Sequence, residues 1–500
     1  MTLFIGADLG TSGCKTALFD SDGTLIASAF SGYRTHYPQD GWHEQSPEDW
    51  WKAVTSSIGQ VLDQVSHRRN EVVGIGLSGQ SLTPIPVDEV GTILTPRVPI
   101  WSDSRATEEC RLYFQGQDEE LWYQKTGNGF PAHLYTIFKV MWMRNHQPDE
   151  FKRTKMILGS KDWINYKLTG QVQTDYSYAA GSGVYDLLKR CYSPELVENS
   201  GLDISLFPNI VESSAVIGKL LPDIAKQLGL DPKVSVVCGG VDNSCMALGA
   251  QNTEPGKIYA SLGSSSWLTI CDDHPILESS LRPFVFPHVI PGLFNSAVST
   301  FGAGTSVTWV MEAMFPQFNG NIDLLVELAA QASVGSKGLV FVPSLAGGTV
   351  FEGGSDLKGS FSGLSVGHTR EHLARAVIEG IPLALRRPLD ELRKITSVNS
   401  QMVVTGGGSK NETWLQIYSD ILNCQLLKTN IEGNAATLGA VTLVGVGLGH
   451  WKDYTQANLA HNNLNDYKPN IINAQLYTTT VLPRFAHSFR QAAELAELPI

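Results

Sequence analysis

The first eighty positions alternate between short apolar runs and turns rich in glycine or polar residues. Apolar runs of strand length occupy residues 3–7 and 14–19, and Asp22-Gly23 is a two-residue hairpin signal before a third run at 25–28. The pattern therefore predicts an antiparallel meander at the start of the chain.

A helical period follows this meander. Ser46 stands at a helix N-cap position with Pro47 as the first helical residue. The apolar positions after it recur at four-residue spacing, as one buried helix face requires: Trp50, Val54, Ile58 and Leu62. Another apolar run at 72–77 reads as a buried strand, so the order of elements predicts an α/β fold.

The rest of the chain divides into a helical middle and a second α/β half. Residues 107–230 read mostly as helices and loops, and residues 234–243 as a strand that runs into a glycine turn. Near the end, a strand, a glycine turn and an amphipathic helix from Thr413 follow one another. We expect a boundary and hinge at 245–255, which gives domains 1–248 and 249–500 packed around a cleft.

One short unit occurs twice, at residues 5–20 and 258–273. Each copy reads as a strand, a loop of glycine and hydroxyl residues, and a second strand. A gap-free alignment of the two copies gives these identical pairs: Ile5/Ile258, Ala7/Ala260, Leu9/Leu262, Gly10/Gly263, Ser12/Ser265, Thr16/Thr269 and Asp20/Asp273. The repeat indicates one supersecondary unit used once in each half.

The first loop has the chemistry of a phosphate site. Glycines let backbone N–H groups approach an anion, and the hydroxyls of Thr11 and Ser12 add donors. Asp8 ends the preceding strand, where a divalent cation between it and a phosphate would explain the acid. A tight hairpin with an exposed aspartate is the alternative for one copy alone. The second copy favours phosphate binding, and its Ser261 in place of Asp8 assigns the acid to the first half.

Two further glycine turns deliver polar groups from strand ends. In Gly239-Gly240-Val241-Asp242, the aspartate could accept a proton from a substrate hydroxyl, or equally could cap the next helix. The residues 406–408 are all glycine, so a flat ring or a phosphate could lie on the backbone there. A plain strand-to-helix turn is the alternative.

Composition and net charge limit the classes of partner that this chain could bind. The 500 residues are 42% apolar and 17% charged, which is typical of a globular protein with two or more domains. The net charge of −12 argues against nucleic acid or an anionic membrane as the main partner. We expect neither a membrane span nor a signal peptide. The seven cysteines include no CxxC pair and predict buried thiols, no zinc site and a reduced, cytoplasmic chain.

Taken in order, these motifs resemble the FGGY family of carbohydrate kinases. Residues 359–379 resemble the family's C-terminal signature, and residues 135–142 resemble its N-terminal signature. Leu134, at the first position of the N-terminal signature, is not one of the residue types usual there. Residues 101–105, WSDSR, resemble the family's W-x-D-x-R loop. The resemblance covers essentially the whole chain. It implies two actin/hexokinase-like (ribonuclease H-like) domains with a nucleotide cleft between them.

The same resemblance implies an ATP-dependent sugar kinase that uses Mg²⁺. Asp242 matches the general base, Asp8 the acid that organises Mg²⁺ and phosphates, and both are candidate metal ligands. The residues implied for ATP are Thr11, Ser12, Lys15, Gly263, Ser264, Gly304, Thr308, Gly407, Gly408 and Asn411. The residues implied for the sugar are Gln80, Ser81, Leu82, Asp103, His133 and Asn243.

The substrate is less sharply implied. Residues 159–181 and the segment PIWSDSR look closest to the xylulokinase branch, which acts on the ketopentose D-xylulose. That branch usually reads Gly-Gln-Met-His-Gly where this chain has Gly-Gln-Ser-Leu-Thr at 79–83. A site that loses a hydrogen-bonding side chain loses discrimination. Ribulose, gluconate and erythritol-like polyols therefore stay open. His133 could compensate, or could be structural.

Two other classes of function share parts of this pattern. An actin-like or chaperone-type ATPase would have the hairpins but not the W-x-D-x-R loop or the C-terminal signature. A non-catalytic sugar-binding regulator could keep the whole fold. The presence of both Asp8 and Asp242 favours the kinase. Members of the family are commonly homodimers, so a homodimer is also implied.

Overall fold

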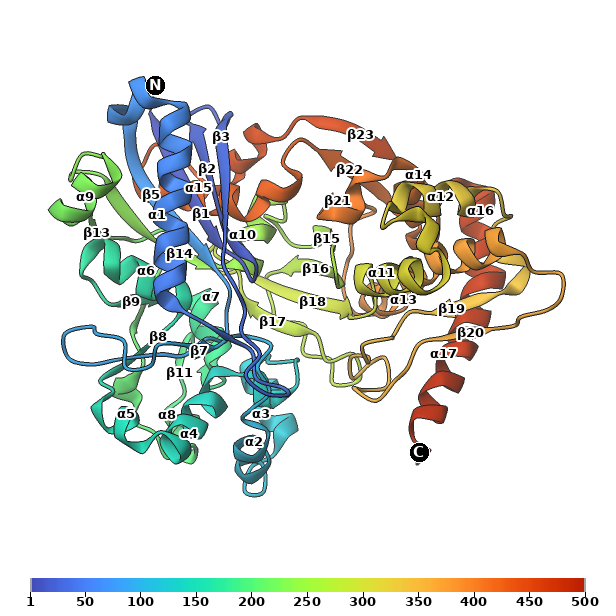
Figure 1. Cartoon of the computed structure of the whole chain (residues 1–500), viewed down its shortest axis with the longest axis horizontal. Coiled ribbons are helices and arrows are strands. Elements are labelled where there is room, and N and C mark those ends of the chain that lie inside the picture. Colours follow the sequence, from blue (N-terminus) through green and yellow to red (C-terminus); the bar gives the residue numbers. More distant parts are fainter. Residues whose placement is uncertain (1, 499–500) are drawn as a thin grey trace.

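A computed structural model describes residues 2–498, and its two halves are each built on one β-sheet (Figure 1). The six-stranded sheet of the first half has the order β13 (Val216–Lys219), β14 (Ser235–Val241), β5 (Val72–Gly79), β1 (Leu3–Leu9), β2 (Gly13–Asp20) and β3 (Leu25–Gly32). The seven-stranded sheet of the second half has the order β17 (Phe284–Pro287), β18 (Phe294–Thr300), β16 (Ser266–Asp272), β15 (Ile258–Leu262), β21 (Gln401–Thr405), β22 (Gln425–Thr429) and β23 (Asn463–Tyr467).

The sequence repeat is a repeat of topology. β1 pairs antiparallel with β2 and parallel with β5. In the same way β15 pairs antiparallel with β16 and parallel with β21. The predicted meander is confirmed, since β2 also pairs antiparallel with β3. Each hairpin loop therefore sits at the same edge of its sheet, at the end of a central strand.

The helix predicted after the meander is α1 (Pro47–Gln64), with Ser46 at the N-cap. Its four-residue apolar period is buried against the first sheet, because Trp50, Val54, Ile58 and Leu62 are all inaccessible to solvent and share a cluster with Ile5 and Leu18. The side chain of Ser46 makes no capping hydrogen bond. The helix is therefore held by its apolar face, which contributes roughly 1.5–3 kcal/mol for each large side chain buried.

The middle of the first half is mostly helical, as predicted. Its helices are α2 (Thr107–Tyr113), α3 (Glu119–Thr126), α4 (Thr136–His146), α5 (Pro148–Arg153), α6 (Ser160–Thr169), α7 (Tyr176–Ala179), α8 (Pro194–Asn199) and α9 (Pro222–Leu228). Short strands that the pattern did not predict lie between them: β8 (Met156–Leu158), β9 (Gln173–Asp175), β10 (Tyr185–Asp186), β11 (Cys191–Tyr192) and β12 (Asn209–Val211).

The second sheet is covered by its own helices. They are α11 (Gly304–Met314), α12 (Ile322–Ala330), α13 (Arg370–Ile395), α14 (Glu412–Leu422) and α17 (Leu482–Ala496). The helix predicted from Thr413 is α14, which begins one residue earlier. Side chains from these helices and from the sheet form one continuous apolar cluster.

One helix of the second half packs against the sheet of the first. α15 (Ala435–Gly447) lies beside β1 and β5 and against α10 (Asp242–Gly249) (Figure 1). Small residues permit the approach: a Cβ on Gly6 would lie 2.3 Å from the Thr437 carbonyl oxygen, and one on Gly439 would lie 2.0 Å from the Cys245 carbonyl oxygen. An apolar cluster therefore joins residues of both halves. The boundary at 248 stays a prediction.

All seven cysteines are unpaired. The expectation that every one is buried is wrong for Cys191, which is exposed because it lies in the two-stranded β10–β11 ribbon outside the main cores, and Cys110 is only half-buried. The other five are buried. Among residues 2–498, the helices are too short or too polar to cross a bilayer.

Candidate active site

Asp8 lies near the end of β1, where two neighbouring strands contribute its partners. Ser78 on β5 is its register partner on one side and donates a hydrogen bond of 2.7 Å to Asp8 Oδ1. Lys15 on β2 is its register partner on the other side. Burial raises the pKa of Asp8, while the Ser78 hydroxyl and the Lys15 charge oppose that rise.

Asp242 is delivered by a glycine turn at the end of β14. Gly239 has φ +77°, and a Cβ there would lie 1.9 Å from the carbonyl oxygen of Leu77 on β5, so this position requires glycine. Val241 holds the N-cap position and Asp242 is the first residue of α10. The geometry therefore does not support the N-cap alternative for Asp242. Its Oδ1 accepts a 2.8 Å hydrogen bond from the Asn243 amide.

The carboxylates of Asp8 and Asp242 lie close enough to repel each other electrostatically. Burial first, and then the charge of Asp8, raises the pKa of Asp242 to about 8. Both side chains keep part of their surface accessible, so water screens this repulsion in part. Burial also raises the pKa of Tyr33, which the charges of Asp8 and Asp242 push in the same direction. The hydroxyl of Tyr33 donates to the Gly10 carbonyl of the first hairpin loop.

The loop at residues 79–83, which is predicted to contact the sugar and is called the sugar loop below, is buried and held by hydrogen bonds. The Gln80 amide donates to the Leu9 carbonyl at 2.8 Å, and the Gln80 carbonyl accepts from Ser160 and Tyr178 at 2.7 and 2.8 Å. Ser81 is 9% exposed and Leu82 is 1% exposed. Leu82 has φ +60°, a left-handed conformation that is rare for a residue with a branched side chain. The loop backbone is therefore fixed by its surroundings.

A buried lysine ties this loop to a second one. Lys139 of α4 donates to the Leu82 carbonyl at 3.0 Å and to the Ile100 carbonyl at 2.6 Å. Burial lowers its pKa to about 7. Trp101, which follows Ile100, is 39% exposed and donates a 2.9 Å hydrogen bond to Thr11 Oγ1. The sugar loop, the W-x-D-x-R loop and the first hairpin are thus linked.

Two predicted sugar residues are placed differently from each other. Asp103 is fully buried, and its oxygens accept from the Arg105 guanidinium at 2.8 Å and from the His43 amide at 2.7 Å. That geometry disfavours direct contact between Asp103 and a sugar. His133 is half-buried, and burial and the nearby Lys139 charge lower its pKa, so its ring is neutral near pH 7. Direct sugar contact by either residue stays a prediction.

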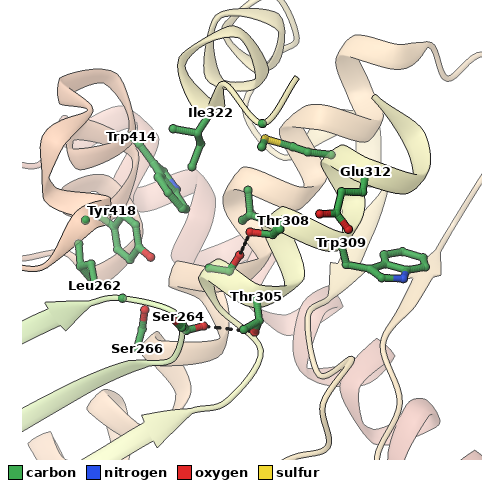
Figure 2. A pocket seen from close by; sticks show the side chains of 17 residues that line it. Leu262, Ser264, Ser266, Thr305, Thr308, Trp309, Glu312, Ile322, Trp414 and Tyr418 are labelled. Carbon is green, nitrogen blue, oxygen red and sulfur yellow. Dashed lines mark hydrogen bonds between the residues drawn. The ribbon is translucent and has the colours of Figure 1, made fainter. Parts of the chain in front are cut away.

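A cavity of about 630 Å³ opens in the second half between the β15–β16 hairpin, α11 and α14 (Figure 2). Figure 2 shows Ser264 and Thr305 at its base, with Trp414 and Tyr418 on one side and Thr308 on the other. Its lining includes six of the residues predicted for ATP: Gly263, Ser264, Gly304, Thr308, Gly407 and Gly408. The volume suits a nucleotide-sized ligand.

Backbone contacts hold together the end of this cavity that lies between the β15–β16 hairpin and α11. The Gly304 and Thr305 amides, at the start of α11, donate to the carbonyls of Gly263 and Ser264 at 3.1 and 3.0 Å. A Cβ on Gly304 would lie 2.6 Å from the Gly263 oxygen, so a side chain there would separate helix and hairpin. The cavity lining in the described chain contains no lysine or arginine. The donors in this lining are therefore uncharged groups: backbone amides, hydroxyls and tryptophan indoles.

The other predicted ATP residues lie outside the cavity. Asn411 caps α14 by accepting from the Trp414 amide at 2.9 Å, and its amide donates to Asp323 at 2.7 Å. Thr11 and Ser12 lie on the first hairpin loop. Lys15 donates to the carbonyl of Gly433 at 2.7 Å, which links the first sheet to the segment that enters α15.

Residues 3–249 match the N-terminal domain and residues 258–448 the C-terminal domain of the FGGY family of carbohydrate kinases. The chain belongs to this family. The FGGY kinase is 30% identical over 483 residues to the xylulose kinase of Bacillus subtilis, covering 96% of this chain and 95% of the relative. It is 31% identical to the xylulose kinase of Staphylococcus xylosus, over 89% and 91% of the two chains.

Solved structures of FGGY kinases have the same fold. A ligand-bound xylulose kinase from Lactobacillus acidophilus superimposes with a TM-score of 0.92 at 25% identity, over 99% of each chain. A gluconate kinase from the same organism gives a TM-score of 0.91 at 25% identity, over 98% of each chain. The predicted architecture of two actin/hexokinase-like domains is confirmed, and the FGGY kinase is a carbohydrate kinase.

Sequence reasoning missed several residues that shape the site of this FGGY kinase. Ser78 orients Asp8, and its signal was the polar SGQS that ends the strand. Lys139 lies in the N-terminal signature, but nothing in the sequence shows which backbone oxygens it would bind. Trp101 belongs to the W-x-D-x-R loop, whose aspartate alone was assigned to the site.

Proposed function

We propose that this kinase transfers the γ-phosphoryl group of ATP to a hydroxyl of a neutral ketopentose, with D-xylulose as the first candidate. The observation that supports it most strongly is the partly exposed Asp242, with its pKa raised to about 8, in the field of Asp8. A carboxylate with a raised pKa is a better proton acceptor than an ordinary aspartate. The curated relatives named xylulose kinase support the choice of sugar.

The proposed reaction is a single displacement. The substrate hydroxyl oxygen bonds to the γ-phosphorus as the bond from that phosphorus to the β–γ bridging oxygen breaks, and ADP leaves. Asp242 accepts the hydroxyl proton. Because the transition state of phosphoryl transfer is loose, most of the catalysis comes from alignment and charge stabilisation. Two features supply that alignment: the fixed backbone at Gly239, and the sugar loop, whose carbonyls are held by Ser160 and Lys139.

The donor set at the two aspartates fits Mg²⁺. Carboxylate oxygens are the ligands that this hard cation prefers, and two adjacent carboxylates leave negative charge for it to offset. Asp8 would hold the ion, with Asp242 beside it. When bound, Mg²⁺ supplies positive charge that stabilises the phosphates of ATP. We propose that the nucleotide itself occupies the 630 Å³ cavity, with its phosphates toward the β15–β16 hairpin.

A neutral substrate is favoured over gluconate because the cations around the sugar loop are already bound. Lys139 donates to two backbone carbonyls. Arg105 and Lys161 each form ion pairs with two carboxylates, and both are buried. A carboxylate substrate would need one of them to give up its partners. The same reasoning leaves ribulose and neutral polyols as alternatives, since they carry no charge.

The test is ADP release in a coupled assay with D-xylulose, D-ribulose, erythritol, xylitol and D-gluconate. Asp242→Ala is the diagnostic variant, and Asp273→Ala, whose side chain is 71% exposed, is the matched carboxylate control. We expect turnover with a ketopentose in the wild type and the control, and none in Asp242→Ala. Turnover with gluconate alone would reject the neutral sugar. Intact ATP binding without sugar-stimulated turnover would indicate a regulator.

Two further properties are part of the proposal. The unpaired cysteines favour a reduced, cytoplasmic setting, and the family resemblance favours a homodimer.

A further inference from the structure

Three charged side chains lie buried behind β14, away from solvent. Lys161 and Asp162 of α6 and Asp175 at the end of β9 are each at most 1% exposed. Lys161 Nζ lies 2.6 Å from Asp162 Oδ1 and 3.1 Å from Asp175 Oδ1. Burying such charges costs several kcal/mol each before pairing repays it. Such a buried cluster of charges often adds little to the stability of the fold. Its contacts with other residues therefore indicate its role.

The cluster reaches the backbone of β14 where the strand loses its regular pairing. The register between β14 and β5 shifts between Val237 and Gly240. On one side of the shift, the Cys238 carbonyl accepts a 2.8 Å hydrogen bond from Asn165 and lies 3.5 Å from Lys161 Nζ. On the other side, the Val241 amide donates to Ser177 Oγ at 3.0 Å. Side chains therefore satisfy backbone groups on both sides of the glycine turn.

Asp175 connects these contacts. Its Oδ2 accepts from the hydroxyl of Ser177 and, at 2.7 Å, from the hydroxyl of Ser213, while the Ser213 carbonyl accepts from the Gly239 amide at 2.9 Å. Because the proton of Ser177 is directed to Asp175, a lone pair of the same oxygen is left to face Val241. Lys161 in turn pairs with the other oxygen of Asp175, Oδ1, at 3.1 Å. The chain of contacts ends one residue before Asp242.

We propose that Lys161, Asp175 and Ser177 are positioning residues that fix the backbone of the glycine turn and thereby aim the carboxylate of Asp242 at the substrate hydroxyl. The inference rests on the proposed role of Asp242 as the base. None of the three residues needs to touch the substrate. Their loss should therefore slow the chemical step and leave the binding of ATP and sugar nearly unchanged, since a displacement of about 1 Å can cost as much as about 10²-fold in rate.

The experiment compares Ser177→Ala with Ser200→Ala. Ser200 is an equally buried serine, 3% exposed, at the C-cap of α8 and away from β14, and its hydroxyl donates to the Val197 carbonyl at 2.6 Å. Each variant is measured for Tm, for kcat and KM with ATP and D-xylulose, and for binding of a non-hydrolysable ATP analogue. We expect similar losses of Tm in the two variants. We expect kcat to fall about tenfold or more only in Ser177→Ala, with both KM values within about twofold of wild type.

A second variant guards against misfolding. Asp175→Asn removes the charge that orients Ser177 and keeps the size of the side chain, so it should give the same split between kcat and KM. The inference is overturned if both variants keep kcat within about twofold, or if Ser200→Ala loses kcat as they do. An Asp242→Ala variant measured in parallel separates the two claims. If it stays active, the proposed base is wrong; if it is inactive while Ser177→Ala and Asp175→Asn are normal, only the positioning role fails.

Discussion

Gly239→Ala is the sharpest test of how Asp242, the proposed base, is placed. The residue has φ +77°, where a side chain costs about 1–2 kcal/mol. The added Cβ would also lie 1.9 Å from the Leu77 carbonyl oxygen, whereas real Cβ contacts essentially never fall below 3.0 Å. The Leu77 oxygen belongs to the backbone of β5 and the new Cβ is fixed to the backbone of β14, so neither atom can rotate away. β14 must therefore move from β5 by about 1 Å, and Asp242, three residues further on, moves with it.

The expected result is a loss of rate much larger than the loss of binding. A shift of about 1 Å at the base predicts a fall in kcat of about 10²-fold, with the KM for ATP within about twofold of wild type. The control is Gly449→Ala, which has φ +70° but no atom within 4 Å of the added Cβ. It should lose about 1 kcal/mol of unfolding free energy and keep its kcat. Coupled ADP release and urea unfolding measure the two quantities.

One outcome would refute this reasoning. If Gly239→Ala loses stability like Gly449→Ala and keeps kcat within about threefold, then the close approach of β14 to β5 does not set the position of Asp242. A fall in kcat that is matched by an equal rise in both KM values would instead indicate a general loosening of the site.

Three other predictions follow from the same geometry. Lys139→Met removes the donor to the Leu82 carbonyl, so the KM for the sugar should rise about tenfold or more, while the KM for ATP should not change. An unchanged KM for the sugar in steady-state kinetics would contradict the role of this lysine. Because a base must be deprotonated and the pKa of Asp242 is raised to about 8, only about one molecule in ten is competent at pH 7 without bound cation. We therefore expect kcat/KM to rise between about pH 6 and pH 8, and the rise to move to lower pH as Mg²⁺ increases; a profile flat with pH at low Mg²⁺ rejects this. A Cβ on residue 304 would lie 2.6 Å from the Gly263 carbonyl oxygen, so Gly304→Ala should force α11 away from that carbonyl. We expect ATP binding, measured by calorimetry, to weaken about tenfold, with thermal unfolding of the apo-protein as the control.

Local patterns were enough to predict the framework of the site. The hairpin at Asp8 and its copy near Gly263 were found from apolar runs, glycine turns and the repeat, because a hairpin and its loop are close in sequence. The strand that delivers Asp242 was found in the same way. The structure confirms these elements and brings the predicted glycines of the second half to one cavity.

Contacts between distant segments were not predictable. Asp103 was expected near the sugar, but its oxygens bind Arg105 and the His43 amide, which lies 60 residues earlier in the chain. Asn411 was implied for ATP, and contact with ATP stays a prediction; the structure shows that it caps α14 and donates to Asp323, which lies 88 residues away. A motif gives the type and order of residues, while the direction of a side chain depends on which partners the tertiary fold brings to it.

The position of α15 has a consequence for how the chain reaches its folded state. The helix covers the first sheet, yet it begins at Ala435, after most of the protein has been made. A ribosome releases the chain from its N-terminus at about 5–20 residues per second, and domains made first usually fold first. Here the close contacts at Gly6 and Gly76 have no partner until α15 emerges. The first domain to be synthesised is therefore among the last to be completed, and its apolar sheet face needs protection from aggregation in the interval.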